Sequence, residues 1–419
     1  MDRFILNFMI LYKIKSLYVR KELKIQTIFP RIMWYDETIK NMAFQRDKVL
    51  GSCMTEDEEE AKMLNAILDE LKLNALVITD PYNMRHVSGF RGGEGALYIS
   101  AAQKVLITDS RYTEQAGKES DFTVIEECRG HNRQTILKEC MEKENVNGDF
   151  HMGYEDQSML CCEFDRLKAE LPVQTWTPLG SRIDDLRQIK TEEELEYLAR
   201  AEEIGDKAFA EFLKIVKPGM TELEAAAELE YLMKKEGAED LSFNTIIASG
   251  LNSSMPHAIP GDKKLEEGDF VTCDFGCKYK GYCSDMTRTF VLGKASDKQK
   301  EIYNVVLKAQ LAGLAAVKAG VSGASVDKVA RDIITEAGYG DCFGHGLGHS
   351  VGLFIHESPR LSPSDDTILK ANMIETVEPG IYVPGFGGVR IEDMVVVTED
   401  GCRNLAHSPK ELIEVPVEK

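Results

Sequence analysis

With 419 residues, the chain exceeds the length of one ordinary hydrophobic core, so two domains are expected. Its apolar content of 43% and charged content of 29% are typical of a soluble globular protein. The formal net charge of −20 argues against nucleic acid or an anionic membrane surface as a main partner, because both bind basic faces.

The ten cysteines form no obvious disulfide framework, and two of them, Cys161 and Cys162, are adjacent. This distribution predicts reduced thiols in a cytoplasmic protein. Cys273, Cys277 and Cys283 lie close together without a paired Cys-x-x-Cys pattern, so packing within strands is favoured over a zinc site. No apolar run approaches the about 18 residues of a membrane-spanning helix, and no membrane association is expected.

Residues 1–50 differ in charge from the rest of the chain. They contain ten Lys or Arg against five Asp or Glu, whereas the remaining residues contain forty against sixty-five. We expect a dispensable basic extension here rather than a membrane-binding helix, because nothing else in the sequence suggests a membrane.

Residues 55–180 alternate between helical and strand patterns. Apolar spacing predicts a helix over Ala61–Leu73. Short apolar runs predict strands at Ala75–Thr79, Ala96–Ser100 and Val105–Thr108. The segment is therefore predicted to be a small α/β domain with a core of its own.

In the following segment, 186–415, the same order of predicted helices and strands occurs twice. Capping boxes at Thr191 and Thr221 predict two helices before a strand hairpin that carries two aspartates. The same order then recurs, with helices starting at Ser296 and Ser325 before strands that carry two glutamates. Two helices followed by a carboxylate-bearing strand pair, occurring twice, predict two structural halves about a pseudo-twofold axis.

Four carboxylates are predicted to meet at these strands. Asp274 and Asp285 lie eleven residues apart around glycines, and Glu378 and Glu392 lie fourteen apart around Pro-Gly turns. Four ionised carboxylates repel one another in a low-dielectric cleft, whereas two divalent cations balance their four negative charges. With His349 as an imidazole ligand, the set predicts a dinuclear site that favours Mn²⁺, Co²⁺ or Zn²⁺.

Such a site has a clear chemical use. Two metal ions about 3.5–4 Å apart hold and activate a hydroxide that faces a scissile carbonyl. His257 and His356, in loops near glycine or proline, are the candidates for stabilising the tetrahedral oxyanion. Arg390, two residues before Glu392, is expected to orient that carboxylate or to bind substrate. Each acidic residue alone is more often structural, so the prediction rests on their combined order and flanks.

In this order and with these flanks, residues from about 185 to the end resemble the creatinase/methionine-aminopeptidase superfamily, the pita-bread metallopeptidases. With the preceding domain included, residues 55–415 resemble the Xaa-Pro aminopeptidase and prolidase branch. The first domain contributes to the resemblance through Asn83–Phe90 and Thr108–Tyr112. The resemblance implies an α/β (α+β) fold, in which a creatinase-like N-terminal domain precedes a pseudo-twofold pita-bread catalytic domain.

The resemblance also implies individual roles for the ligands. Asp285 and Glu392 would bridge the two metal ions, and Asp274 would bind one of them. His349 and Glu378 would bind the other ion, and Glu378 would also handle the proton of the bridging hydroxide.

Family histidines that contact substrate or stabilise the intermediate match His257, His345 and His356. No ligand position is missing, which counts against creatinase-like members and against non-enzymatic binding members that have lost ligands.

We therefore expect a cytoplasmic, metal-dependent Xaa-Pro aminopeptidase that acts on small peptides with proline second, with Asp274 near the substrate's free amine. A dedicated enzyme has a physical rationale, because proline fixes φ and lacks the backbone N–H. The alternatives are a prolidase, which cleaves only Xaa-Pro dipeptides with the same ligands, and a non-catalytic peptide-binding protein. The expected cofactors are two Mn²⁺ ions, with Co²⁺ or Zn²⁺ as alternatives, and the resemblance implies a homodimer.

Overall fold

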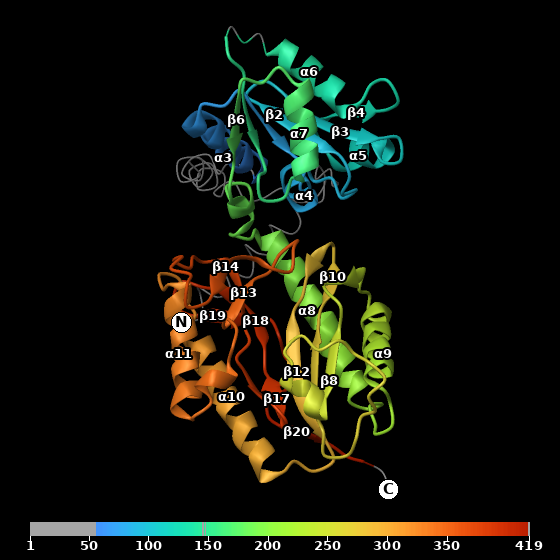
Figure 1. Ribbon diagram of the computed structural model, residues 1–419, viewed down its shortest axis with the longest axis vertical. Coiled ribbons are helices and arrows are strands. Elements are labelled where there is room, and N and C mark those ends of the chain that lie inside the picture. Colours follow the sequence, from blue (N-terminus) through green and yellow to red (C-terminus); the bar gives the residue numbers. More distant parts are fainter. Residues whose placement is uncertain (1–55, 145, 147, 418–419) are drawn as a thin grey trace, which may run out of the picture. The chain divides into compact units, whose positions relative to one another are not determined.

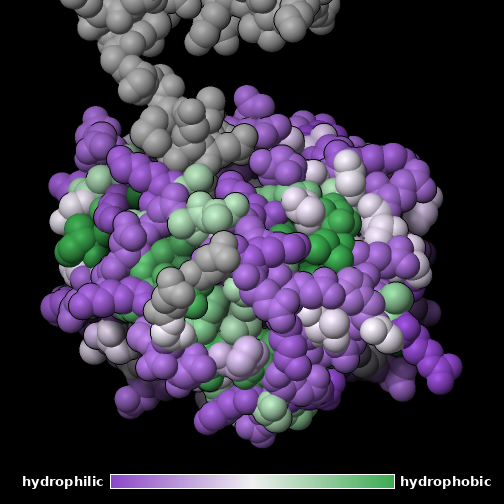
Figure 2. Space-filling view, turned by 90° about the horizontal axis from the view of Figure 1, so that it is seen from above, coloured by the Kyte–Doolittle hydropathy of each residue, from purple (hydrophilic) through white to green (hydrophobic). Residues whose placement is uncertain are grey.

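The computed structural model describes residues 56–144, 146 and 148–417. The expected basic extension over 1–50 lies outside these residues. Within them, no helix is both long and apolar enough to cross a bilayer. Hydrophilic side chains cover most of the face that Figure 2 shows, with smaller hydrophobic areas between them.

The N-terminal domain is built on a six-stranded sheet with the order β4-β3-β2-β1-β5-β6. Its strands are β1 (Ala75–Ile78), β2 (Ala96–Ser100), β3 (Lys104–Asp109), β4 (Thr123–Glu127), β5 (His151–Tyr154) and β6 (Thr175–Pro178). Its helices are α3 (Glu56–Leu71), α4 (Pro81–Ser88), α5 (Thr113–Glu119), α6 (Arg133–Lys143) and α7 (Cys161–Glu170). The small α/β domain expected from the sequence is confirmed.

Strand β1 shows why the strands of this sheet have uninterrupted apolar sequences. Leu76 and Ile78 pack into a core with residues of α3 and α4. Ala75 and Val77, which alternate with them, join a second core with residues of α6 and α7. Both faces of the sheet are thus covered, so both sets of alternating side chains are apolar.

The helices of the second domain come in two pairs. They are α8 (Glu192–Phe212), α9 (Glu222–Lys235), α10 (Asp297–Ala316) and α11 (Gly323–Glu336). Capping boxes open α8 at Thr191, α9 at Thr221 and α10 at Ser296, as predicted. Helix α11 begins earlier than predicted, because the side chain of Ser322 accepts a hydrogen bond from the backbone N–H of Ser325.

The strands lie between the two helix pairs (Figure 1). The first half contains β7 (Asp240–Leu241), β8 (Ile246–Ser249), β9 (Phe270–Phe275), β10 (Cys277–Tyr279), β11 (Tyr282–Cys283) and β12 (Met286–Leu292). The second half contains β13 (Gly348–Ser350), β14 (Glu357–Leu361), β15 (Ile374–Val377), β16 (Gly380–Val383), β17 (Gly387–Arg390), β18 (Asp393–Val397) and β19 (Cys402–Asn404). The last strand, β20 (Ile413–Val415), returns to the first half and pairs with β12. Short 3₁₀ helices occur at η1 (Asp184–Arg187), η2 (Gly250–Ser254) and η3 (Gly340–Cys342).

Each half has its own hydrophobic core. One core joins α8 and α9 to β9 and β12, and the other joins α10 and α11 to β15, β17 and β18. This arrangement confirms the pita-bread organisation of two similar halves. Cys273 and Cys277 are buried in the first of these cores, and Cys283 is buried in a separate cluster with Leu195 and Met394. Burial raises the pKa of Cys283 to about 11 and that of Cys277 to about 12. Packing is therefore the role that the structure gives these cysteines.

Two antiparallel strand pairs bring the acidic residues together. Strands β9 and β12 pair with Phe275 opposite Met286, which places Asp274 and Asp285 at one end of the pair. Strands β15 and β18 pair with Val377 opposite Asp393, so Glu378 and Glu392, the adjoining residues, also meet at one end. The two halves are joined where the N–H of Glu392 donates to the carbonyl of Thr287 at 3.1 Å.

Candidate metal centre

The five predicted ligands lie together. One carboxylate oxygen from each of Asp274, Asp285 and Glu392 lies within 4.8 Å of the others. His349 Nε2 lies 3.5 Å from Asp285 Oδ2 and 3.6 Å from Glu378 Oε1. Two strand pairs and the short strand β13 thus converge on one cluster of four carboxylates and one imidazole.

The position of His349 depends on a close approach between β13 and β15. A Cβ on Gly348 would lie 1.9 Å from the carbonyl oxygen of Thr376, so glycine is required there. The Thr376 hydroxyl accepts a hydrogen bond from the N–H of His349 at 3.1 Å and donates to Glu378 Oε1 at 3.2 Å. One threonine therefore sets the relative positions of two of the five side chains.

The imidazole of His349 is held in its neutral form. Its Nδ1 lies 3.0 Å from the carbonyl oxygen of Ser350, which leaves Nε2 facing the carboxylates. Burial lowers the pKa of His349 to about 3. A neutral imidazole whose second nitrogen is fixed by a backbone carbonyl is the usual arrangement of a metal-binding histidine.

Three of the carboxylates lie in an environment that disfavours their charged forms. Burial, and next the neighbouring carboxylates, raise the pKa of Asp285 and of Glu392 well above the usual range. Burial raises the pKa of Glu378 to about 8. Among the described residues, Asp274 Oδ1 is buried and has no hydrogen-bond partner. This donor set of oxygens and one imidazole nitrogen fits divalent cations such as Mn²⁺, Co²⁺ and Zn²⁺.

A cavity of about 540 Å³ opens onto the five residues. The other residues predicted for catalysis or substrate binding, His257, His345, His356 and Arg390, also line it. His257 and His356 are exposed, and the ring of His356 lies 4.6 Å from that of His349. Burial lowers the pKa of His356, which therefore favours its neutral form.

His345 and Arg390 belong to a buried hydrogen-bond network. Arg390 donates to Asp274 Oδ2 at 2.6 Å and to the hydroxyl of Tyr382 at 2.7 Å. That hydroxyl lies 3.0 Å from His345 Nε2. Burial, and next the charge of Arg390, lower the pKa of His345 to about 4. The network links the arginine directly to the carboxylate of Asp274, and it reaches Glu392, which its sequence position had suggested, only through Thr287.

Besides Thr376, sequence reasoning missed further residues that hold the site together. Thr287 accepts a hydrogen bond from Arg390 Nε at 3.0 Å and donates to Glu392 Oε2 at 2.7 Å. Tyr382 joins Arg390 to His345, and Glu202 of α8 accepts a hydrogen bond from the backbone N–H of Asp285 at 3.3 Å. The alternating residues around Thr287 are typical of any β-strand, so they gave no signal of a special role. The contacts of Tyr382 and Glu202 depend on the tertiary fold.

The fold and the site define a two-domain α/β protein with a buried centre suited to divalent metals. Residues 61–189 match the Creatinase/Prolidase N-terminal domain, and residues 196–399 match Metallopeptidase family M24. The chain is 40% identical to the Xaa-Pro dipeptidase of Pyrococcus furiosus, a similarity that covers 85% of this chain and 100% of that one. The chain therefore belongs to Metallopeptidase family M24.

Solved structures agree with this assignment. The Xaa-Pro dipeptidase from Bacillus anthracis is 41% identical, with a TM-score of 0.82 over 85% of this chain and 99% of that one. The X-Pro aminopeptidase from Thermotoga maritima is 39% identical, with a TM-score of 0.77 over 83% of this chain and 99% of that one. The chain is thus a metallopeptidase, and its homodimeric state and cytoplasmic location stay predictions.

Proposed function

We propose that this metallopeptidase is an Xaa-Pro dipeptidase that requires two divalent ions, with Mn²⁺ as the first candidate. The observation that carries the proposal is the exposed side chain of Arg360, which lines the same cavity as the five ligands. In the part of the chain that the structure describes, no carboxylate forms an ion pair with this guanidinium. A free cation in a peptide-binding cavity suits the C-terminal carboxylate of a dipeptide.

The relatives support the same choice. The dipeptidases of Pyrococcus furiosus and Bacillus anthracis favour this alternative over the aminopeptidase expected from the sequence. The Thermotoga maritima X-Pro aminopeptidase has nearly the same identity, so overall similarity does not decide substrate length. The residues that contact the substrate's C-terminal end therefore decide between a dipeptidase and an aminopeptidase.

Individual side chains have distinct proposed roles. Asp274, Asp285, His349, Glu378 and Glu392 would hold the ions. When bound, these ions supply the Lewis acidity that activates water and polarises the scissile carbonyl. His257 and His356, exposed in the cavity, are placed to donate hydrogen bonds to the developing oxyanion.

Two further roles concern the proton and the substrate. Glu378, whose pKa burial raises to about 8, is suited to accept a proton and pass it to the leaving proline nitrogen. Arg360 would bind the dipeptide carboxylate, and His345 and Arg390 would shape the part of the cavity next to Asp274.

The test compares Ala-Pro with Ala-Pro-Ala, using protein stripped of metal and then reloaded with Mn²⁺. Metal-dependent cleavage of Ala-Pro alone is the expected result. Cleavage of the tripeptide after its first alanine would instead establish the aminopeptidase reading. Ala-Ala serves as the control for the proline requirement, and failure to cleave any peptide in the loaded state would overturn the proposal.

A further inference from the structure

Glu357, the residue after His356, is a buried carboxylate held by two cations. Its Oε1 accepts a hydrogen bond from Arg187 Nε at 3.1 Å, and its Oε2 accepts one from Lys190 Nζ at 2.9 Å. The side chains of Glu357, Arg187 and Lys190 are 3%, 7% and 1% exposed. Both cations come from η1 and the residues after it, which connect the two domains. The pairing therefore joins this connection to the loop that carries His356.

The carboxylate also shapes the loop from inside. Glu357 Oε1 accepts a hydrogen bond from the N–H of Phe354 at 3.2 Å. A Cβ on Gly352 would lie 2.4 Å from Glu357 Oε2, so the chain turns directly around this carboxylate. Because β14 begins at Glu357, the orientation of His356 depends on where this carboxylate is held.

Helix α4 contacts the same loop directly through Tyr82 and supports Arg187 indirectly through Asn83. Arg187 Nη1 donates to Asp184 Oδ1 at 3.0 Å, and that oxygen accepts a hydrogen bond from Asn83 Nδ2 at 2.9 Å. The ring of Tyr82, the residue before Asn83, lies 5.1 Å from the ring of Phe354. The loop is thus fixed by a chain of polar contacts and by an aromatic contact that both start on one short helix.

We propose that Glu357 is a positioning residue for His356, and that Arg187 and Lys190 hold it in place. The proposal rests on the proposed function, because Glu357 acts through the histidine that meets the oxyanion. A carboxylate held between two fixed cations restricts the loop more than a single hydrogen bond does. Part of the N-terminal domain is then needed to place a group in the active site.

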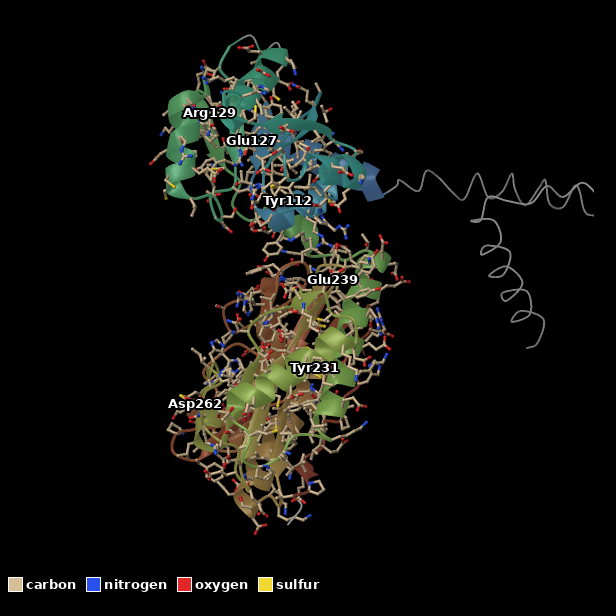
Figure 3. The ribbon with its side chains drawn as sticks, turned by 90° about the vertical axis from the view of Figure 1, so that its right-hand side faces the viewer. Tyr112, Glu127, Arg129, Tyr231, Glu239 and Asp262 are labelled. Atoms are coloured by element: carbon tan, nitrogen blue, oxygen red, sulfur yellow. The ribbon has the colours of Figure 1, made fainter. Side chains whose placement is uncertain are left out.

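The test begins with Arg187→Met and a matched control, Arg133→Met, in the full-length protein loaded with Mn²⁺. Arg133 also pairs with glutamates, at 2.7 Å from Glu163 and 3.4 Å from Glu127, all of them residues of the N-terminal domain. Glu127 is labelled in that domain in Figure 3. Arg187→Met is expected to lower kcat by about tenfold with little change in KM, since loss of a positioning contact affects the transition state. Arg133→Met is expected to leave both constants within about twofold of wild type.

A double-mutant cycle separates positioning from general destabilisation. If Arg187 acts through His356, then Arg187→Met lowers kcat by less than about twofold in a His356→Ala background. A full tenfold loss in that background would overturn the proposal. If Arg187→Met fails to fold, Arg187→Lys replaces it in the double-mutant cycle. Lysine keeps the positive charge but cannot bind Glu357 and Asp184 together.

Hydrogen exchange tests the loop without any substrate. The amide of Phe354 is expected to exchange at least about tenfold faster in Arg187→Met than in wild type or in Arg133→Met. Unchanged exchange would show that the carboxylate does not hold the loop. Because this measurement needs no cleavage, its failure is distinct from a failure of the proposed dipeptidase activity.

Discussion

Arg390 and Asp274 form a buried ion pair in which Nη2 lies 2.6 Å from Oδ2. The other oxygen of Asp274 is buried and has no hydrogen-bond partner within the described residues. One oxygen is thus fixed by the protein, and the second remains for a cation. The same guanidinium reaches Glu392 through the hydroxyl of Thr287, so a single arginine orients two of the predicted ligands.

We predict that Arg390→Lys weakens metal binding by about 10–100-fold, because an ammonium group cannot contact Asp274, Tyr382 and Thr287 together. Titration of metal-free protein with Mn²⁺, followed by calorimetry, measures this change. Arg360→Lys is the matched control, since Arg360 lines the same cavity and pairs with none of the ligands. Equal Mn²⁺ affinity in the two variants would contradict the orienting role of Arg390.

A second prediction concerns metal removal. The clustered carboxylates repel one another without cations, so stripping the metal should lower the thermal stability as well as abolish cleavage. Added Mn²⁺ at a hundred times its Kd should restore about 2.7 kcal/mol of stability for each ion bound. Scanning calorimetry of wild type and of Asp285→Asn checks this, and the variant should gain much less from Mn²⁺. An identical gain in both proteins would place the bound ions elsewhere.

The order of elements and the clustering of the acidic residues were predictable from the sequence because they depend on local signals. Capping boxes mark where α8 and α9 start, and the turn-separated Asp274 and Asp285 indicate adjacent strands. The dinuclear site follows from charge balance alone, without knowledge of the fold.

The contacts around the ligands were not predictable, because they join residues that are distant in sequence. Tyr382 reaches His345 across a separation of 37 residues, and Glu202 reaches Asp285 across 83. Arg390 shows the same limit. Its spacing from Glu392 suggested a shared strand face, but β17 ends at Arg390 and the guanidinium turns toward Asp274. Strand periodicity describes one chain segment and carries no information about its neighbours in space.

A third prediction concerns the pH dependence of stability. Glu375 on β15 is fully buried, and neither of its carboxylate oxygens has a hydrogen-bond partner among the described residues. Burial raises its pKa well above the usual range, although the charge of Lys190 opposes this in part. The folded protein therefore holds this proton at a pH where the unfolded chain has lost it. The free energy of unfolding then falls as the pH rises from the unfolded pKa through the folded pKa.

Glu375→Gln should remove that loss, because an amide carries no titrating proton. We expect the variant to match wild type at about pH 5 and to exceed it by about 1–3 kcal/mol at about pH 8. Urea unfolding at both pH values, with Mn²⁺ held saturating, measures the difference. Glu228→Gln on the exposed face of α9 is the control and should change neither value. A constant difference across the pH range would contradict the buried-proton explanation.

The last prediction concerns substrate length and rests on Arg360. If its guanidinium binds the carboxylate of an Xaa-Pro dipeptide, Arg360→Ala should raise KM for Ala-Pro by at least about tenfold, the loss of one charge-assisted hydrogen bond. The prolinamide analogue Ala-Pro-NH₂ lacks that carboxylate, so its cleavage should be poor in wild type and nearly unchanged in the variant. Steady-state kinetics with both substrates separates this role from a general loss of activity, which would affect them equally. Equal losses of activity toward the two substrates would favour the aminopeptidase hypothesis, because an aminopeptidase has no need to recognise a carboxylate directly after proline.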